Sequence, residues 1–163
     1  MLDQSTVTVL LVEDDEVDIE AVRRAFAKEQ IANRIEVAHN GLEALDCLRG
    51  TGSRSKIEGP YMILLDLNMP KMNGIEFLKE LRADNALCNS IVFVLTTSDA
   101  DQDKLAAYRE HVAGYLLKGK VGEGFVEIVR MLECYSRYVE FPPQTSSLFP
   151  TQLRSSQCKN DEN

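Results

Sequence analysis

Residues 7–16 read VTVLLVEDDE, a short apolar run (7–12) that leads into four consecutive acidic residues. Further apolar runs of this kind are found at 62–65, 91–95 and 114–117. Asp66, Thr96 and Lys118 directly follow these runs. Short apolar runs between helical patterns indicate parallel strands of an α/β sheet, whose ligands bind where the strands end. We therefore expect the acids, Thr96 and Lys118 to share one crevice suited to accepting a phosphoryl group.

The rest of the chain alternates between strand and helix patterns, which predicts five repeated βα units. In the stretch 17–29, Ile19, Val22 and Phe26 recur at the spacing of an amphipathic helix. Further helices are expected at 41–48, 75–82, 101–109 and 124–138, and one more short strand at 34–38. The stretch 49–60, rich in Gly, Ser and charge, is expected to form a surface loop.

The composition restricts the possible functions. With 163 residues, 44% hydrophobic and 27% charged, the chain suits one globular domain, which we place at 1–141, followed by a flexible tail at 142–163. The net charge of −8, with dispersed basic residues, argues against nucleic-acid binding. No stretch approaches the length of a membrane span, and the N-terminus lacks a signal-peptide pattern. We expect a cytoplasmic protein with no membrane partner.

The acids after the first strand suggest a cation site. Adjacent carboxylates repel one another unless a cation lies between them. Within the run 13–16, Asp14 and Asp15 are the expected ligands of a hard divalent ion, and Mg²⁺ suits an open site of oxygen ligands. The same run also fits a solvated acidic turn in which Asp15 or Asp18 caps the following helix. The run alone does not decide between these two interpretations.

Asp66 favours the cation site. A carboxylate inside a buried strand is costly, so Asp66, which follows the apolar run 62–65, belongs at the end of that strand. There it can bind a metal, or attack phosphorus and become an acyl phosphate. Phosphoryl transfer requires in-line positioning and neutralisation of the phosphoryl oxygens. Mg²⁺ and the compact charge of Lys118 are suited to that task.

Two further residues complete the predicted site. Thr96 closes the fourth strand, where its hydroxyl could donate to a phosphoryl oxygen. Thr97 and Ser98, which follow it, are explained by strand propensity and helix capping. Asn68, two residues after the acid at position 66, could offer its backbone carbonyl to the metal. Each feature is weak alone, whereas their order along the chain is specific.

This ordered set of residues resembles the receiver domain of two-component response regulators, over roughly residues 6–137. The resemblance implies an α/β, flavodoxin-like (βα)5 fold: a doubly wound, five-stranded parallel sheet with strand order 2-1-3-4-5. One departure is clear, because the family usually has proline after the lysine where this chain has Gly119.

The resemblance also implies a role for each matching residue, with Mg²⁺ as the cofactor. The implied roles are metal-binding acids (Asp14, Asp15 and Asp66), phosphoacceptor (Asp66), backbone metal ligand (Asn68), switch hydroxyl (Thr96), switch aromatic (Tyr115) and phosphoryl-pairing lysine (Lys118).

On this resemblance, a partner histidine kinase phosphorylates Asp66, and the surface of the fourth helix, fifth strand and last helix transmits the signal without an attached output domain. The chain would be a phosphoacceptor rather than an enzyme, beyond catalysing its own phosphorylation and dephosphorylation. The loop 49–60, the segment 95–100 and the last helix running into 138–143 resemble those of small stand-alone receivers that serve bacterial phytochrome histidine kinases.

The last predicted helix has apolar residues beyond one stripe, including Met131, Cys134 and Tyr138. A helix that packs on one side against its own sheet does not need them. We expect an isologous homodimer through this helix and the fifth strand. The alternative is that the segment 141–149 folds back over the same face.

Three other classes of function fit the sequence less well. A phosphatase of the haloacid dehalogenase type would need a second aspartate where the chain has Asn68. A flavodoxin-type electron carrier would need hydroxyls and backbone amides where the acidic run 13–16 lies, and that run would repel a flavin phosphate. A phosphorylation-independent binding scaffold is disfavoured by the intact acceptor set, although Gly119 keeps it open.

Overall fold

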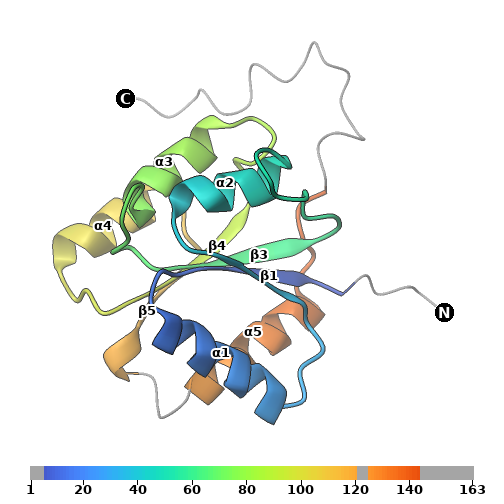
Figure 1. Ribbon diagram of the computed structural model, residues 1–163. Helices are drawn as coiled ribbons and strands as arrows, with labels where there is room; N and C mark the ends of the chain where they lie inside the picture. Colours follow the sequence, from blue (N-terminus) through green and yellow to red (C-terminus); the bar gives the residue numbers. More distant parts are fainter. Residues whose placement is uncertain (1–5, 121–124, 144–163) are drawn as a thin grey trace.

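A computed structural model describes residues 6–120 and 125–143 as a parallel sheet with helices on both faces (Figure 1). The strands are β1 (Thr8–Val12), β2 (Ile35–Ala38), β3 (Tyr61–Leu65), β4 (Ile91–Thr96) and β5 (Gly114–Leu117). The α-helices are α1 (Glu16–Lys28), α2 (Gly41–Arg49), α3 (Gly74–Ala83), α4 (Asp101–Arg109) and α5 (Val126–Tyr138). The strands are all parallel, in the order β2-β1-β3-β4-β5, which confirms the predicted flavodoxin-like (βα)5 fold.

The elements begin and end within two residues of the positions expected from the sequence. The first strand begins at Thr8 rather than at position 7, and the last helix begins at Val126. The expected helix start at position 124 lies outside the described residues, as does the predicted tail from 144 onward. Within the described residues, the sequence pattern therefore located each strand and each α-helix, but not the short 3-10 helix at Lys118–Lys120.

The central strands are buried on both faces. Along β1, Leu10 and Val12 pack into a core with α2 and α3, whereas Val9 and Leu11 pack into a second core with α1 and α5. Successive side chains of a strand point to opposite faces, so every residue of β1 needs to be apolar or small. This explains why the strands appear in the sequence as continuous apolar runs rather than as alternating patterns.

The helices form two layers of unequal packing. Figure 1 shows α1 and α5 on one face of the sheet and α2, α3 and α4 on the other. The core-facing side of α1 buries four residues, Ile19, Val22, Ala25 and Phe26. In contrast, α4 buries only Ala107 and exposes Leu105 and Tyr108. Of the described helices, not one has both the length and the apolar character that crossing a bilayer requires.

Three helices begin with a side-chain cap beside the carboxyl ends of the strands. Asp15, Asn40 and Asn73 precede α1, α2 and α3, and each side chain accepts a backbone N–H from the first turn of its helix. Such caps satisfy donors that the helix itself leaves unpaired. They fix the points where the chain turns from strand to helix, and these turns carry the polar residues of the predicted site.

Arg82, in α3, forms hydrogen bonds that hold two loops against this helix. Its Nε donates to the carbonyl of Glu110 at 2.7 Å, and Nη1 donates to the carbonyls of Cys88 and Ser90 at 2.7 and 2.8 Å. Nη2 donates to the carbonyl of His111 at 3.0 Å. One guanidinium group thus satisfies four backbone acceptors in the loops that precede β4 and β5.

We expect Arg82→Met to lower the free energy of unfolding by roughly 2–4 kcal/mol, because it leaves several half-buried carbonyls without a charged donor. Urea denaturation would measure the loss. Arg24→Met is the matched control: the side chain of Arg24 is 79% exposed and pairs only with Glu20 among the described residues. That change should cost less than about 0.5 kcal/mol. Equal losses in the two variants would contradict the role given to Arg82.

Candidate functional site

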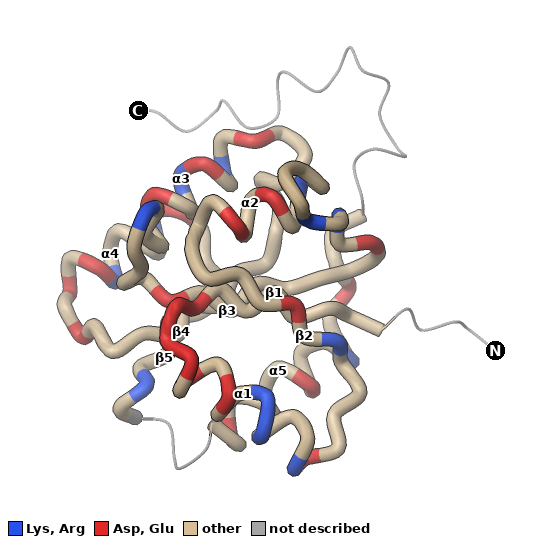
Figure 2. The backbone as a smooth tube through the Cα atoms, in the orientation of Figure 1, with Lys and Arg blue, Asp and Glu red and all other residues tan. Residues whose placement is uncertain are grey.

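The ends of four strands bring the polar residues together. Val12 of β1 is paired with Leu65 of β3, and Leu65 with Val94 of β4. Thr96 at the end of β4 is paired with Leu117 of β5. The residues that follow these positions therefore lie along one edge of the sheet. Figure 2 shows acidic residues clustered at this edge, where β1 leads into α1.

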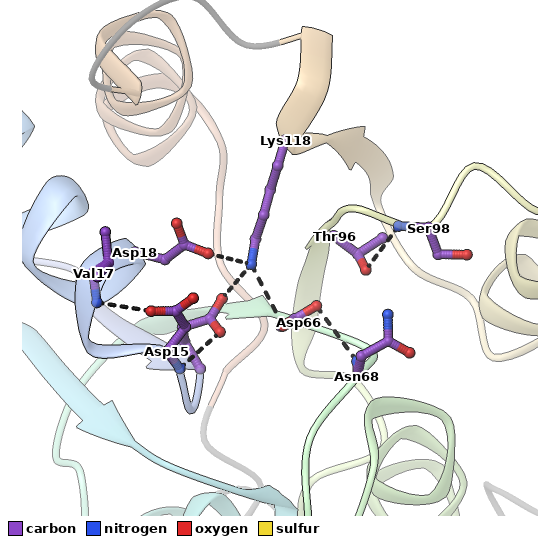
Figure 3. A network of polar contacts seen from close by, with 9 residues as sticks. Asp15, Val17, Asp18, Asp66, Asn68, Thr96, Ser98 and Lys118 are labelled. Atoms are coloured by element: carbon purple, nitrogen blue, oxygen red, sulfur yellow. Dashed lines mark hydrogen bonds and ion pairs between the residues drawn. The ribbon is translucent and has the colours of Figure 1, made fainter.

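Asp66 lies at the centre of the edge. It follows β3 directly, its backbone N–H donates to the carbonyl of Val12 at 3.0 Å, and the residue is 7% exposed. One carboxylate oxygen, Oδ1, accepts the backbone N–H of Asn68 at 3.4 Å, and the other, Oδ2, lies 3.4 Å from Nζ of Lys118 (Figure 3). The structure therefore brings Asp66, Asn68 and Lys118 together, and the contact of Asn68 is made by its backbone N–H, whereas the predicted metal-binding role concerns its backbone carbonyl.

Lys118 is surrounded by carboxylates. Its Nζ donates to Oε2 of Glu13 and to Oδ2 of Asp18, both at 2.7 Å, and these contacts are shorter than the one to Asp66 (Figure 3). Burial disfavours the charged form of the lysine, but the hydrogen bonds to Asp18 and Glu13 outweigh it and raise the pKa of Lys118 above its usual value. The ammonium group therefore stays charged in the crevice.

Glu13 is a buried acid that the sequence interpretation did not select. Burial raises the pKa of Glu13 to about 7, and the negative charge of Asp66 adds to the rise, while the hydrogen bond from Lys118 opposes it. The crevice thus holds more negative charge than one lysine offsets. A surplus of this kind favours the arrival of further positive charge.

A group of three carboxylates could hold a metal ion. One oxygen from each of Glu13, Asp14 and Asp66 lies within 4.8 Å of the others. Carboxylate oxygens are hard ligands, which suit Mg²⁺ and similar divalent ions. The acids present therefore fit a hard divalent cation.

Asp15 does not lie in this group, contrary to the pair expected from the sequence. Its Oδ1 accepts the backbone N–H of Val17 at 2.8 Å, so it caps α1 (Figure 3). The difference arises because the hydrogen-bond ladder between β1 and β2 ends later than the sequence suggests. The backbone N–H of Glu13 still donates to the carbonyl of Ala38, so the chain follows the sheet one residue beyond β1 and turns into the helix at Asp15. The structure pairs Asp14 with Glu13 instead.

Thr96 and Tyr115 are linked through Ser98. Thr96 is fully buried, and its Oγ1 accepts the backbone N–H of Ser98 at 3.3 Å (Figure 3). The hydroxyl of Tyr115 donates to the carbonyl of Ser98 at 2.8 Å. Burial raises the pKa of Tyr115, so its hydroxyl remains a donor at neutral pH. The two residues predicted for a switch therefore contact the same loop between β4 and α4.

Asp18 is the second residue that the sequence interpretation missed as a site residue. It was considered only as a helix cap, whereas its carboxylate binds Lys118. A signal was present, because Asp18 lies four residues before the buried Val22 and therefore on the same side of α1. That side faces the sheet and the end of β5.

Gly74 allows the loop after Asp66 to pass close to α3. A Cβ atom at position 74 would lie 2.7 Å from the carbonyl oxygen of Asp66 and 2.7 Å from Cα of Leu67. The backbone N–H of Gly74 also donates to the carbonyl of Leu67 at 2.9 Å. The absence of a side chain here sets the position of the Asp66 loop.

Comparison with known proteins identifies response regulators in each case. Residues 9–130 match the family model of the response regulator receiver domain. Response regulator Rcp1 from Synechocystis sp. is 34% identical over 127 residues, which cover 78% of this chain and 86% of that protein. A crystal structure of Rcp1 in a Mn²⁺-bound form matches with a TM-score of 0.74 at 33% identity, covering 84% of this chain and 99% of that one.

Two further solved structures are similar over most of the chain. A two-component response regulator from Legionella pneumophila is 44% identical, with a TM-score of 0.68, covering 79% of this chain and 98% of its own. The phosphorylated cyanobacterial phytochrome response regulator RcpA is 31% identical, with a TM-score of 0.76, covering 85% and 100%.

We expect Gly74→Ala to lower the free energy of unfolding by roughly 1–3 kcal/mol and to weaken divalent-metal binding, because the new methyl group displaces the backbone of Asp66. Urea denaturation and calorimetric titration with Mg²⁺ would measure both effects. Gly119→Ala is the matched control, since a Cβ at Gly119 meets no described atom within 4 Å. The idea fails if the two variants are equally stable and bind the ion equally well.

Proposed function

The chain belongs to the response regulator receiver domain family, and we propose that its Asp66 accepts a phosphoryl group from a phosphohistidine of a partner histidine kinase. The single observation that carries the proposal is the setting of Asp66. Its carboxylate is almost fully buried at a strand end, 3.4 Å from a charged lysine and grouped with two further acids. Receiver domains are generally phosphoacceptors rather than enzymes, and this chain is proposed to act in that way.

The transfer is an in-line displacement at phosphorus. An oxygen of Asp66 forms the new O–P bond as the N–P bond of the phosphohistidine breaks, and the bonding electron pair returns to the imidazole nitrogen. Lys118 stays charged and lies close enough to pair with a phosphoryl oxygen on Asp66. Thr96 lies at the end of the adjacent strand, and its hydroxyl would donate to another of these oxygens.

A divalent cation, which we take to be Mg²⁺, would be held by Asp14, Asp66 and Glu13, with the backbone carbonyl of Asn68 as a further ligand. The acid group of this chain supports that set, and the Mn²⁺-bound form of Rcp1 is a related receiver that takes a divalent ion. Bound there, the ion would neutralise charge on the phosphoryl oxygens. Asp15 is not included, because its side chain caps α1.

The signal would leave through the face formed by α4, β5 and α5. A hollow on this face is lined by Tyr108 of α4, Tyr115 and Leu116 of β5, and Ile128 and Met131 of α5, among others. Tyr115 connects this hollow to Ser98, next to Thr96. A shift of Thr96 toward a phosphoryl group would therefore alter the loop to which Tyr115 is bonded, a local event that biases a two-state surface.

We propose a histidine kinase of the phytochrome type as the partner. The likeness to RcpA, a phytochrome response regulator, supports this choice. The alternative is a binding scaffold that works without phosphorylation. A phosphatase that uses Asp66 as nucleophile is the weaker alternative, because Asn68 stands where that chemistry needs a second acid.

We expect incubation with Mg²⁺ and acetyl phosphate to add one phosphoryl group to the intact protein, as read by mass spectrometry. Asp66→Asn should remain unmodified because an amide oxygen does not attack phosphorus in this way, and a chelator should abolish the reaction. Asp84→Asn is the matched control, since Asp84 pairs with Arg49 outside the crevice. A wild-type chain that takes no phosphoryl group under any condition would support the scaffold instead.

A homodimer through α5 and β5 is also proposed. Glu127 and Met131 line the hollow on this face, and Cys134 and Tyr138 continue the same helical stripe. Tyr138 is 78% exposed, and covering its large apolar ring with a second copy of the chain would be energetically favourable. The alternative is that the segment 141–149 folds back over this face of α5. Residues 144–149 lie outside the described part of the chain, and Phe141 packs against Tyr135 of α5.

We expect Tyr138→Asp to weaken dimerisation roughly tenfold or more, because it places a charge in an apolar interface. Sedimentation velocity over a micromolar concentration series would measure it. Val17→Asp is the matched control, because Val17 is similarly exposed (76%) but lies on α1. A wild-type chain that stays monomeric at high micromolar concentration, with and without phosphorylation, would remove the proposed dimer.

A further inference from the structure

The ammonium group of Lys118 has no free hydrogen for a new partner. An ammonium has three N–H donors. In this structure Nζ lies within hydrogen-bonding reach of three carboxylates: Glu13 and Asp18 at 2.7 Å, and Asp66 at 3.4 Å. If Asp66 carries a phosphoryl group, as the proposed function requires, the N–H that faces Asp66 can turn to a phosphoryl oxygen, but a second bond to the phosphoryl group requires Lys118 to release Glu13 or Asp18.

The three carboxylates differ in how easily they can be released. The side chain of Glu13 is 3% exposed, so an unpaired charge on it would be costly, whereas Asp66 gives up its own carboxylate charge when it is phosphorylated. The side chain of Asp18 is 25% exposed. It also lies in the first turn of α1, where the helix dipole stabilises a negative charge. Breaking the ion pair between Asp18 and Lys118 therefore costs less free energy than breaking the contact between Glu13 and the lysine.

We propose that Asp18 is a positioning residue that holds Lys118 in the unphosphorylated state and gives it up to the phosphoryl group. Asp18 and the phosphoryl oxygens compete for the same ammonium group. The free energy of the Asp18–Lys118 ion pair is then subtracted from the stability of the phosphorylated form. Asp18 sets how strongly the site retains a phosphoryl group, although it does not touch that group itself.

A merely structural ion pair would behave differently. If Asp18 only anchored α1 or kept Lys118 correctly oriented, its loss would weaken the binding of a phosphoryl mimic or leave it unchanged. Competition predicts the opposite sign. The sign of the effect, and its dependence on the lysine, separate the two cases.

The test is the affinity of the Mg²⁺-loaded full chain for beryllofluoride, a stable phosphoryl mimic, followed by NMR titration. We expect Asp18→Asn to bind it about two to five times more tightly than wild type, the range expected for a partly exposed ion pair. Glu20→Gln is the matched control: it removes one negative charge from the same helix, where Glu20 pairs with Arg24 instead of Lys118. It should match wild type.

A double-mutant cycle assigns the effect to the lysine. With Lys118→Met as the background, adding Asp18→Asn should no longer tighten binding, because the ammonium group for which Asp18 and the mimic compete is absent. Asp18→Ser, a smaller neutral side chain, should reproduce the gain and serves if Asp18→Asn folds poorly.

The outcomes are distinguishable. Equal or weaker binding by both Asp18 variants, with wild type binding normally, would overturn the inference and leave the proposed function intact. A gain that persists in the Lys118→Met background would overturn it as well, because the effect would not pass through the lysine. A wild-type chain that binds no beryllofluoride would overturn the proposed function and this inference together.

Discussion

The ion pairs of Lys118 join parts of the chain that are far apart in sequence. Glu13 follows β1, Asp18 belongs to α1, Asp66 follows β3, and Lys118 itself follows β5. Each acid would repel its neighbours in this crevice without the lysine, because little water reaches it. The lysine does not balance all of this charge, and the pKa of Glu13 is raised mainly by burial, with the charge of Asp66 adding to the rise. Both the fit to a divalent ion and the proposed phosphoacceptor chemistry follow from that imbalance.

The parallel sheet restricts where such charge can lie. The strands β1, β3 and β4 are buried on both faces, so charged side chains are tolerated only where these strands end. All strands run in the same direction, so the ends of β1, β3, β4 and β5 lie along one edge. The close approach of Gly74 then fixes the loop that carries the acid of β3. The fold thus gathers the site as a consequence of its own packing.

Much of this was predictable from the sequence, and the exceptions have physical causes. Asp66, Thr96 and Lys118 follow apolar runs that can only be buried strands, so their places were evident. The choice between Glu13 and Asp15 was not, because it depends on one ladder hydrogen bond from Glu13 that lengthens the strand's path. The contact of Asp18 with Lys118 spans 100 residues and depends on how α1 is rotated against the sheet. Hydrophobic periodicity carries no mark of the ladder hydrogen bond, and it places Asp18 on the sheet-facing side of α1 without identifying Lys118 as its partner.

The uneven packing of the helices explains which element the site can influence. Burial of a large apolar side chain contributes about 1.5–3 kcal/mol, and α1 buries three of these, Ile19, Val22 and Phe26, besides Ala25, whereas α4 buries only the small Ala107. The start of α4 is held instead by polar contacts, with Ser98 bonded to Asp103 and Lys104 paired with Asp99. Ser98 in turn contacts both Thr96 and Tyr115. The helix α4, which buries least, therefore follows the loop that both Thr96 and Tyr115 contact, so a small change at Thr96 acts on the most weakly packed of the described helices.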